Sequence, residues 1–327
     1  MSGTGGRRRG AIATVGIDLG GTKMLAVRLD GGTVVDERRT SNPSGRVPVT
    51  DALVATVGEM LTDDVDAIGV GIAGLVEWPE GIFVWGPHVA GTGLRLRDHL
   101  ETAFGVAAVV DNDANAAAYA EHTRGSARGY DHVVLVTLGT GIGGAIIADG
   151  RLHRGSSFAG EWGHTLFERN GERCACGKRG CWETVASAPA LERLAADFIH
   201  RNPEGTLAVR LAGEAITGQA VTRAADEGDE TARGLVAQVG ADLGLGLCNL
   251  IATLDPQIVV VGGGLGSVGE SLLGPARRVA ADALHGGSHR MLPPIVVAEH
   301  GPSAGAIGAA MMASDLVTGN LELDGRR

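Results

Sequence analysis

Aromatic residues are scarce in this sequence, and their scarcity limits the kind of core it can build. They make up 3% of the 327 residues, whereas 44% of the residues are hydrophobic and 53 are glycine. The core must therefore consist mainly of alanine, valine and leucine, joined by many tight turns, which favours a packed α/β protein. The length is sufficient for two domains of ordinary size.

An excess of basic residues is also lacking. The chain has 28 basic and 38 acidic residues, for a net charge of −10, which argues against nucleic acid or a membrane surface as the main partner. No apolar run approaches the length of a membrane span, and no hydrophobic region of the secretory kind follows the N-terminal segment MSGTGGRRRG. We therefore expect a cytoplasmic protein with a disordered tail over residues 1–11 and a frayed tail over residues 317–327.

Cysteine is nearly absent outside one stretch, which runs from Ala159 to Ser187. Three of the four cysteines lie there at the spacing C-x-C-x4-C, downstream of a histidine; the set is His164, Cys174, Cys176 and Cys181. These are the ligands that tetrahedral zinc prefers. Three buried cysteines or a disulfide are alternatives, but the surrounding residues are typical of a loop, and a disulfide would leave one thiol unpaired.

A site with four protein ligands has no open position, so the predicted zinc is structural. Such a site would join the segments that carry Glu161, His164 and Glu183. If one imidazole nitrogen of His164 binds the metal, the other remains available to a ligand hydroxyl.

The first part of the chain predicts a β-hairpin with a glycine-rich turn. Strands are expected at Ala13–Leu19 and Met24–Leu29, and the turn between them contains Gly20, Gly21, Thr22 and Lys23. No helix follows the glycines, which excludes a Rossmann or Walker-type site. Glycine backbone N–H groups can approach a phosphate closely, and Asp18 is placed to hold a magnesium ion directly or through water.

A second copy of this pattern occurs later in the chain. Val15–Gly31 (VGIDLGGTKMLAVRLDG) and Val134–Gly150 (VLVTLGTGIGGAIIADG) align without a gap, and Gly139, Thr140 and Gly141 begin the second glycine-rich turn. Two similar halves, each with such a hairpin, predict a nucleotide held by its phosphates between two similar domains. The alternative is that both segments are simply tight turns.

Two further segments carry candidate polar or glycine-rich sites. A strand at Ala107–Val110 leads into Asp111-Asn112-Asp113-Ala114-Asn115 and then a helix expected from Ala116 to His122. One Asx residue would suffice as a helix cap, so the surplus suggests function, with Asp113 as a weak base stabilised as an anion by the helix N-terminus. Later, Gly262, Gly263 and Gly264 follow a strand and suit either nucleoside contact or a plain turn.

Taken together, these motifs resemble the ROK family of repressors, open reading frames and sugar kinases, within the actin-like ATPase and hexokinase superfamily. The matching segments span nearly the whole chain in family order: Asp18–Lys23, Gly71–Gly74, Asn112–Ala116, Leu138–Gly144, Gly160–His164, Cys174–Glu183 and Gly262–Gly264.

The resemblance implies two actin-like (ribonuclease H-like) domains flanking a cleft that binds a hexose, most simply glucose. It divides the chain into a smaller N-terminal domain (residues 12–111 plus 303–316) and a larger one (residues 112–302) that carries the zinc segment 164–181. It implies that Asp113 is the catalytic base, that Gly74, Asn112, Glu161, His164 and Glu183 bind the sugar, and that the hairpins hold ATP phosphates with Mg²⁺. It also implies a homodimer or homotetramer.

Two departures from the family pattern concern the sugar. Glu77 stands where many family glucokinases have Asp, and Gly86-Pro87-His88 replaces an Ala-Pro-Asn-type sugar-contact loop. His88 is therefore either a substituted sugar contact or a bystander, and fructose, mannose, allose or N-acetylamino-sugar kinases remain alternatives. Polyphosphate also remains open as a donor. A repressor would need a DNA-binding domain before Val15, for which the preceding segment is too short, and a sensor would bind sugar without turnover.

Overall fold

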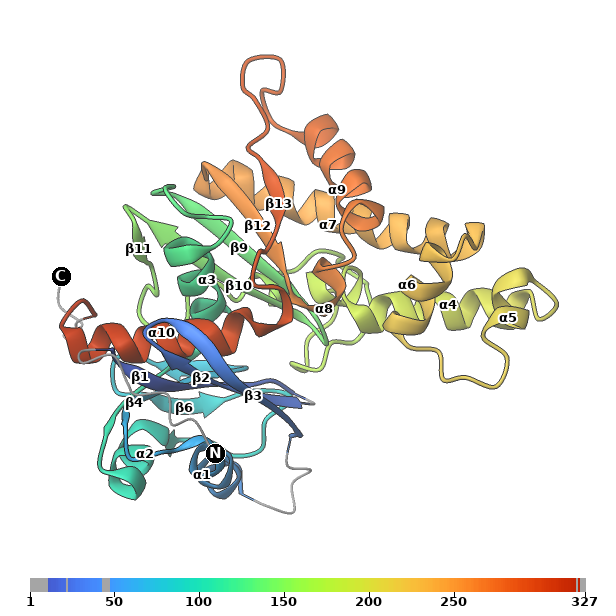
Figure 1. The fold of residues 1–327 in the computed structure, drawn as a ribbon. Coiled ribbons are helices and arrows are strands. Elements are labelled where there is room, and N and C mark those ends of the chain that lie inside the picture. Colours follow the sequence, from blue (N-terminus) through green and yellow to red (C-terminus); the bar gives the residue numbers. More distant parts are fainter. Residues whose placement is uncertain (1–10, 22, 43–47, 322, 324–327) are drawn as a thin grey trace, which may run out of the picture. The chain divides into compact units, whose positions relative to one another are not determined.

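The computed structural model describes residues 11–21, 23–42, 48–321 and 323. The predicted N-terminal tail lies outside these residues except for Ala11, as does Thr22, whereas residues 317–321 and 323 of the predicted C-terminal tail lie within them. Within them, the chain forms two compact units: unit 1 consists of the described residues up to 121, residues 154–158 and the described residues from 303 onward, and unit 2 consists of residues 122–153 and 159–302. Each unit contains its own sheet and core (Figure 1).

Unit 1 is built on a mixed sheet with the strand order β3-β2-β1-β4-β8. Its first three strands are antiparallel neighbours, while β4 is parallel to β1 and β8 is parallel to β4. The strands are β1 (Ala13–Leu19), β2 (Lys23–Asp30), β3 (Thr33–Ser41), β4 (Val65–Ile72) and β8 (Ala107–Asn112), and a small separate sheet contains β5 (Leu75–Glu77), β6 (Ile82–Trp85) and β7 (Leu94–Arg95).

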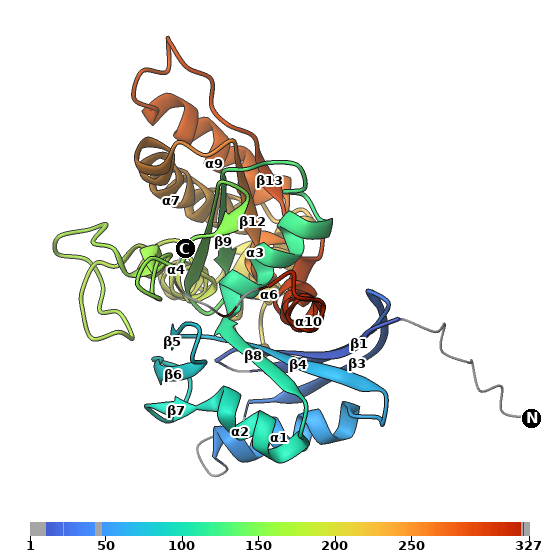
Figure 2. The ribbon, with the colours of Figure 1, turned by 90° about the vertical axis from the view of Figure 1, so that its left-hand side faces the viewer.

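Helices cover both faces of the unit 1 sheet, as Figure 2 shows. Helices α1 (Val49–Met60) and α2 (Leu96–Phe104) contribute Leu53 and Leu100 to the core on one face. Helix α10 (Ala304–Thr318) packs on the other face through Ala306 and Ala310. Because α10 continues to Thr318, the chain is still helical at the start of the segment expected to fray.

Glycines in the strands allow α10 to approach the sheet closely. A Cβ atom on Gly16 of β1 would lie 2.1 Å from the carbonyl oxygen of Ala306, and one on Gly69 of β4 would lie 1.8 Å from that of Ala309. Helix α3 (Asp113–Arg124) is equally close, because a Cβ atom on Gly308 would lie 1.7 Å from the carbonyl oxygen of Ala116. This contact explains why unit 1 extends through Glu121 instead of ending at the expected residue 111.

The sheet of unit 2 repeats the topology of the first. Its order is β11-β10-β9-β12-β13, with β9, β10 and β11 antiparallel and with β12 and β13 added in parallel. The strands are β9 (Val133–Leu138), β10 (Ile142–Ala148), β11 (Arg151–Leu152), β12 (Ile258–Gly262) and β13 (Ile295–Val297). The two glycine-rich turns fall at aligned positions, after Leu19 and after Leu138. The structure thus confirms the predicted duplicated core.

Helices of unit 2 pack on the sheet and on one another, with α7 alongside α9 (Figure 1). They are α4 (Ala188–Arg201), α5 (Thr206–Arg210), α6 (Gly218–Asp226), α7 (Glu230–Leu254), α8 (Gly263–Gly266) and α9 (Glu270–Ala283), and short 3-10 turns are η1 (Trp162–His164), η2 (Trp182–Thr184) and η3 (Gly301–Ser303).

Helix α7 is long and apolar enough to cross a membrane, with a mean hydropathy of 1.6, contrary to the expectation that no run approaches that length. The most apolar stretch of this helix is 56% buried within the protein, and Val239, Leu243 and Leu247 lie in the unit 2 core. A core helix meets the same length and hydropathy criterion, so α7 is weak evidence for a membrane.

Candidate active site

The first glycine-rich turn is braced by contacts from elsewhere in unit 1. The side-chain amide of Asn42 donates to the carbonyl oxygens of Gly20 at 2.8 Å and Gly21 at 3.0 Å. The exposed His88 lies on the same turn, because a Cβ atom on Gly21 would be 2.6 Å from the Cβ atom of His88. Lys23 is exposed at the start of β2. His88 is therefore a neighbour of the predicted phosphate hairpin, a placement the sequence did not suggest.

The candidate base Asp113 is the first residue of α3, directly after β8. Asn112 caps the helix, since its Oδ1 accepts from the backbone N–H groups of Ala114 at 2.8 Å and Asn115 at 3.2 Å. Its Nδ2 donates to the carbonyl oxygen of Gly74 at 3.1 Å. The structure thus brings three of the predicted sugar-site residues together, and the helix begins earlier than the expected Ala116.

Asp18, in the unit 1 sheet, and Asp113, at the start of α3, both lie next to Gly71 of β4. Asp18 of β1 is the register partner of Gly71 in β4. A Cβ atom on Gly71 would lie 3.2 Å from the Cα atom of Asp113, so Asp113 stands directly over β4. Burial, together with the nearby carboxylate of Asp113, raises the pKa of Asp18 to about 8. Asp18 is only partly exposed, and a nearby cation would stabilise its carboxyl as the anion.

The pKa of Asp113 differs from the expectation that the helix N-terminus would stabilise its anion. The backbone N–H of Ala114 donates to its Oδ1 at 2.9 Å and lowers its pKa, as expected at a helix N-terminus. Burial has the larger effect, however, and together with the carboxylate of Asp111 it raises the pKa of Asp113 to about 6. The expectation of a carboxyl stabilised as the anion was therefore wrong in direction, and Asp113 is a stronger base than an ordinary aspartate.

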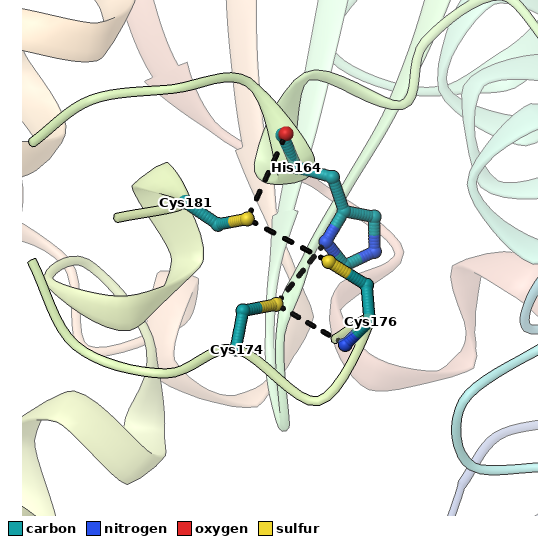
Figure 3. Close-up of side chains that lie close together, drawn as sticks. All are labelled: His164, Cys174, Cys176 and Cys181. Atoms are coloured by element: carbon teal, nitrogen blue, oxygen red, sulfur yellow. Dashed lines mark hydrogen bonds between the residues drawn. The ribbon is translucent and has the colours of Figure 1, made fainter. Parts of the chain in front are cut away.

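In unit 2, the predicted zinc ligands form one cluster (Figure 3). The ligand atoms of His164, Cys174, Cys176 and Cys181 all lie within 4.8 Å of one another. The Sγ atoms of Cys176 and Cys181 are 3.7 Å apart, and the Sγ atom of Cys174 lies 3.6 Å from Nδ1 of His164. Tetrahedral zinc with normal bond lengths requires separations of about 3.8 Å and about 3.6 Å, so the cluster fits this metal. All four cysteines of the chain are free thiols.

Glu183 connects this cluster with the second glycine-rich turn. Its Oε1 accepts from the thiol of Cys174 at 2.8 Å and lies 3.4 Å from Nδ1 of His164. Its Oε2 accepts from the backbone N–H of Ile142 at 3.4 Å, and a Cβ atom on Gly141 would lie 2.3 Å from the same oxygen. The structure therefore places Glu183, His164 and the turn at Gly139, Thr140 and Gly141 side by side.

Two tryptophans fix the loop that carries the cluster. The ring of Trp162 lies 2.0 Å from the position of a Cβ atom on Gly144, and the ring of Trp182 lies 1.9 Å from that on Gly246. The indole N–H of Trp182 also donates to the carbonyl oxygen of Asp242 at 3.1 Å. Only glycine allows such close approach, so Gly144 and Gly246 serve the packing of this loop.

The triple glycine also lies beside the second glycine-rich turn. Gly262 ends β12 as the register partner of Thr137 in β9. Gly263 has a φ of 80°, and a Cβ atom there would lie 2.4 Å from the carbonyl oxygen of Leu138. At Gly264 a Cβ atom would meet nothing within 4 Å. A turn explains Gly263, and Gly264 is exposed.

The sequence as a whole matches the profile of the ROK family over residues 14–316. The chain belongs to the ROK family. Its curated relatives include a glucokinase of Streptomyces coelicolor, 34% identical over 92% of this chain and 98% of the relative. They also include a xylose repressor of Bacillus subtilis, 27% identical over 95% of this chain and 81% of the relative.

A solved ROK family structure has the same fold. The glucokinase of Streptomyces griseus, crystallised with glucose and AMPPNP, superposes with a TM-score of 0.87 at 36% identity, over 93% of this chain and 99% of that one. The predicted family and the two-domain actin-like fold are thereby confirmed.

Within this ROK family chain, the predicted site residues divide between the two units. Unit 1 holds Asp18, Gly20, Gly21, Lys23, Gly74, Asn112 and Asp113. Unit 2 holds Gly139, Thr140, Gly141, Glu161, His164, Glu183, the cysteines and Gly262–Gly264. No motif in the sequence predicted individual roles for Asn42, Asp111, Asn115 or Arg154. The run of Asx residues was a signal for Asp111 and Asn115, whereas Asn42 and Arg154 lie in segments without one.

Proposed function

We propose that this protein is an ATP-dependent sugar kinase that transfers the γ-phosphoryl group of ATP to the 6-hydroxyl of glucose. The main support is near full-length similarity to ROK glucokinases, together with a partly buried aspartate of raised pKa at the position of the family's base. The second observation matters because repressors share the family, and a carboxyl with a pKa of about 6 is poised to accept a proton near neutral pH.

In the proposed mechanism, Asp113 accepts the proton of the sugar hydroxyl as that oxygen attacks the γ-phosphorus. The bond between the γ-phosphorus and its bridging oxygen breaks, and ADP leaves with the electron pair. Because the transition state of phosphoryl transfer is loose, positioning and charge stabilisation matter more than strong base catalysis. Asn112, held by its hydrogen bond to Gly74, orients the sugar next to Asp113.

Further roles follow from the same proposal. Glu161, His164 and Glu183 bind the pyranose, with Nε2 of His164 facing a hydroxyl because Nδ1 faces the cysteines. The turns at Gly20–Lys23 and Gly139–Gly141 bind the phosphates through backbone N–H groups, and Gly262–Gly264 contact the nucleoside. Asp18 would hold Mg²⁺, which neutralises phosphate charge and would keep this buried carboxyl ionised.

We further propose that His164, Cys174, Cys176 and Cys181 hold one structural zinc ion. Thiolate and imidazole ligands at tetrahedral separations support zinc over a harder cation such as magnesium. The metal would hold in place the loop that carries His164 and Glu183, the proposed pyranose-binding residues. Cytoplasmic location and homodimeric or homotetrameric assembly complete the proposal, the latter by analogy with the family.

The proposal is tested by ATP- and Mg²⁺-dependent phosphorylation of a hexose panel with zinc retained. We expect the highest kcat/KM for glucose among glucose, mannose, fructose, allose and N-acetylglucosamine. A preference for another sugar would keep the mechanism and assign the specificity to a different feature, with the loop at His88 as the first candidate. Sugar binding without turnover of any of them would contradict the kinase proposal and favour a sensor.

A further inference from the structure

A short segment, Arg154–Phe158, belongs to unit 1 although the chain on both sides of it belongs to unit 2. Its first residue forms an ion pair with Asp111, the last residue but one of β8. The Nε atom of Arg154 donates to Oδ2 of Asp111 at 2.8 Å, and Nη2 lies 2.7 Å from the same oxygen. The side chains are only 12% and 2% exposed, so this pair is shielded from water.

The other carboxylate oxygen of Asp111 accepts hydrogen bonds from two residues that flank the candidate base Asp113 in the sequence. Oδ1 accepts from the backbone N–H of Asn112 at 2.7 Å and from the side-chain amide of Asn115 at 2.9 Å. Asn112 ends β8, and Asn115 lies in the first turn of α3. A single carboxylate therefore ties the end of the strand to the start of the helix, with Asp113 between them.

Arg154 is itself held in place. Its guanidinium carbon lies 3.7 Å from the ring centroid of Trp78, a cation–π contact. The backbone N–H of Trp78 donates in turn to Oγ of Ser157 at 3.1 Å. Ser157 has a φ of 102°, which a non-glycine residue rarely adopts, so the surrounding contacts impose this conformation.

We propose that Arg154 is a positioning residue for phosphoryl transfer, acting through Asp111 on the orientation of Asn112 and Asp113. The inference rests on the proposed kinase function. A buried carboxylate without a cation partner would turn toward other donors or towards water, because an unpaired buried charge is costly. The guanidinium fixes Oδ2 and thereby directs Oδ1 at Asn112 and Asn115.

The test compares Arg154→Met and Arg154→Lys with Arg28→Met as a matched control. Arg28 forms another partly buried ion pair in unit 1, with Nη2 3.2 Å from Oδ2 of Asp64, and this pair is separate from the hydrogen bonds of Asp111 described above. We expect Arg154→Met to lower kcat/KM for glucose by about 10- to 100-fold, because small displacements of reacting groups cost this much. Arg154→Lys should fall between Arg154→Met and the wild type, and Arg28→Met should match the wild type.

A second measurement separates positioning from loss of fold. AMPPNP binding, followed by calorimetry at 25 °C, should keep one site per chain and a Kd within about twofold of the wild type for Arg154→Met. Reduced turnover with intact nucleotide binding supports the inference, and unchanged glucose kinetics in Arg154→Met overturns it. If Arg154→Met fails to bind AMPPNP, the same comparison is made with Arg154→Lys.

The inference and the proposed function fail in different ways. A wild-type protein that makes no sugar phosphate contradicts the proposed function. In that case the readout is the Kd for glucose, which Asn112 contacts in the proposed site. A tenfold weaker Kd in Arg154→Met would still support positioning, and an unchanged Kd would overturn it.

Discussion

Opposing influences set the pKa of Asp113: burial, the largest, disfavours its anion, and backbone N–H groups such as that of Ala114 favour it. Because burial has the larger effect, the group is protonated below about pH 6 and ionised above it. A base works only when ionised, so kcat/KM for glucose should fall about tenfold per pH unit below that pKa. Asp113→Asn should abolish turnover at every pH while melting as one cooperative unit. A pH-independent rate, or an active Asp113→Asn, would contradict the assignment.

Asp18 makes a different prediction, about stability. The folded state holds the Asp18 proton up to about pH 8, whereas the unfolded state releases it near 3.8. The unfolded state thus binds fewer protons between these values, and the free energy of unfolding contributed by this group falls as pH rises from about 4 to about 8.

Asp18→Asn lacks this penalty and should raise the Tm at pH 8 by at least about 3 °C in Mg²⁺-free, nucleotide-free buffer. At pH 4 the difference should be small, because this pH barely exceeds the unfolded-state pKa of 3.8 and little of the penalty has developed. Calorimetric melts at the two pH values measure both effects. A Tm gain of the same size at both would show that the charge is not its cause.

At the scale of elements, the close approach of α10 to the unit 1 sheet depends on glycine. Gly69→Ala would place a methyl group 1.8 Å from the carbonyl oxygen of Ala309, so the helix must move. We expect a loss of about 1–3 kcal/mol in the free energy of unfolding, measured by urea denaturation. Gly58→Ala, in α1 with nothing within 4 Å of the new methyl group, is the matched control and should gain about 0.5–1 kcal/mol. Equal effects of both changes would contradict the packing account.

Elements with a local signal were predictable from the sequence. Strand β1 has the predicted bounds, because its apolar run leads directly into the glycine-rich turn. The hairpins of both units follow from glycine turns between apolar strands. Strand β3 was missed because all of its 9 residues are exposed and show no alternation between buried and exposed positions. The start of α3 was placed too late, because several Asx residues compete for the cap position.

In the candidate site, too, residues that lie close together in the sequence were predictable, and contacts between distant segments were not. The Cys and His residues of the cluster lie close in sequence, so their spacing revealed them before their geometry was known. The pair between Arg154 and Asp111 joins segments 43 residues apart, and neither residue carries a local signal for the other. The raised pKa of Asp113 was likewise hidden, because burial is a property of the folded chain.

At the scale of the whole molecule, the proposed zinc ion would hold together the loop that carries His164, Cys174, Cys176 and Cys181. We expect about one zinc per chain by elemental analysis, and removal by a chelator should lower the Tm by more than about 5 °C, because metal binding free energy adds to folding free energy. Cys176→Ser should lose the zinc. Cys248→Ser, which changes a buried cysteine of α7 outside the cluster, should retain it. A folded, active protein without zinc would refute the metal site.

The duplicated fold, the basic aspartate and the family relationship together support one central claim, that the protein phosphorylates glucose at the expense of ATP. The most direct test follows ³¹P resonances of ATP, ADP and sugar phosphate in one reaction with glucose and Mg²⁺, alongside calorimetric titration of glucose. We predict stoichiometric conversion of ATP to ADP and glucose 6-phosphate by the wild-type protein and none by Asp113→Asn. Saturable glucose binding with no sugar phosphate formed by the wild type would contradict the claim.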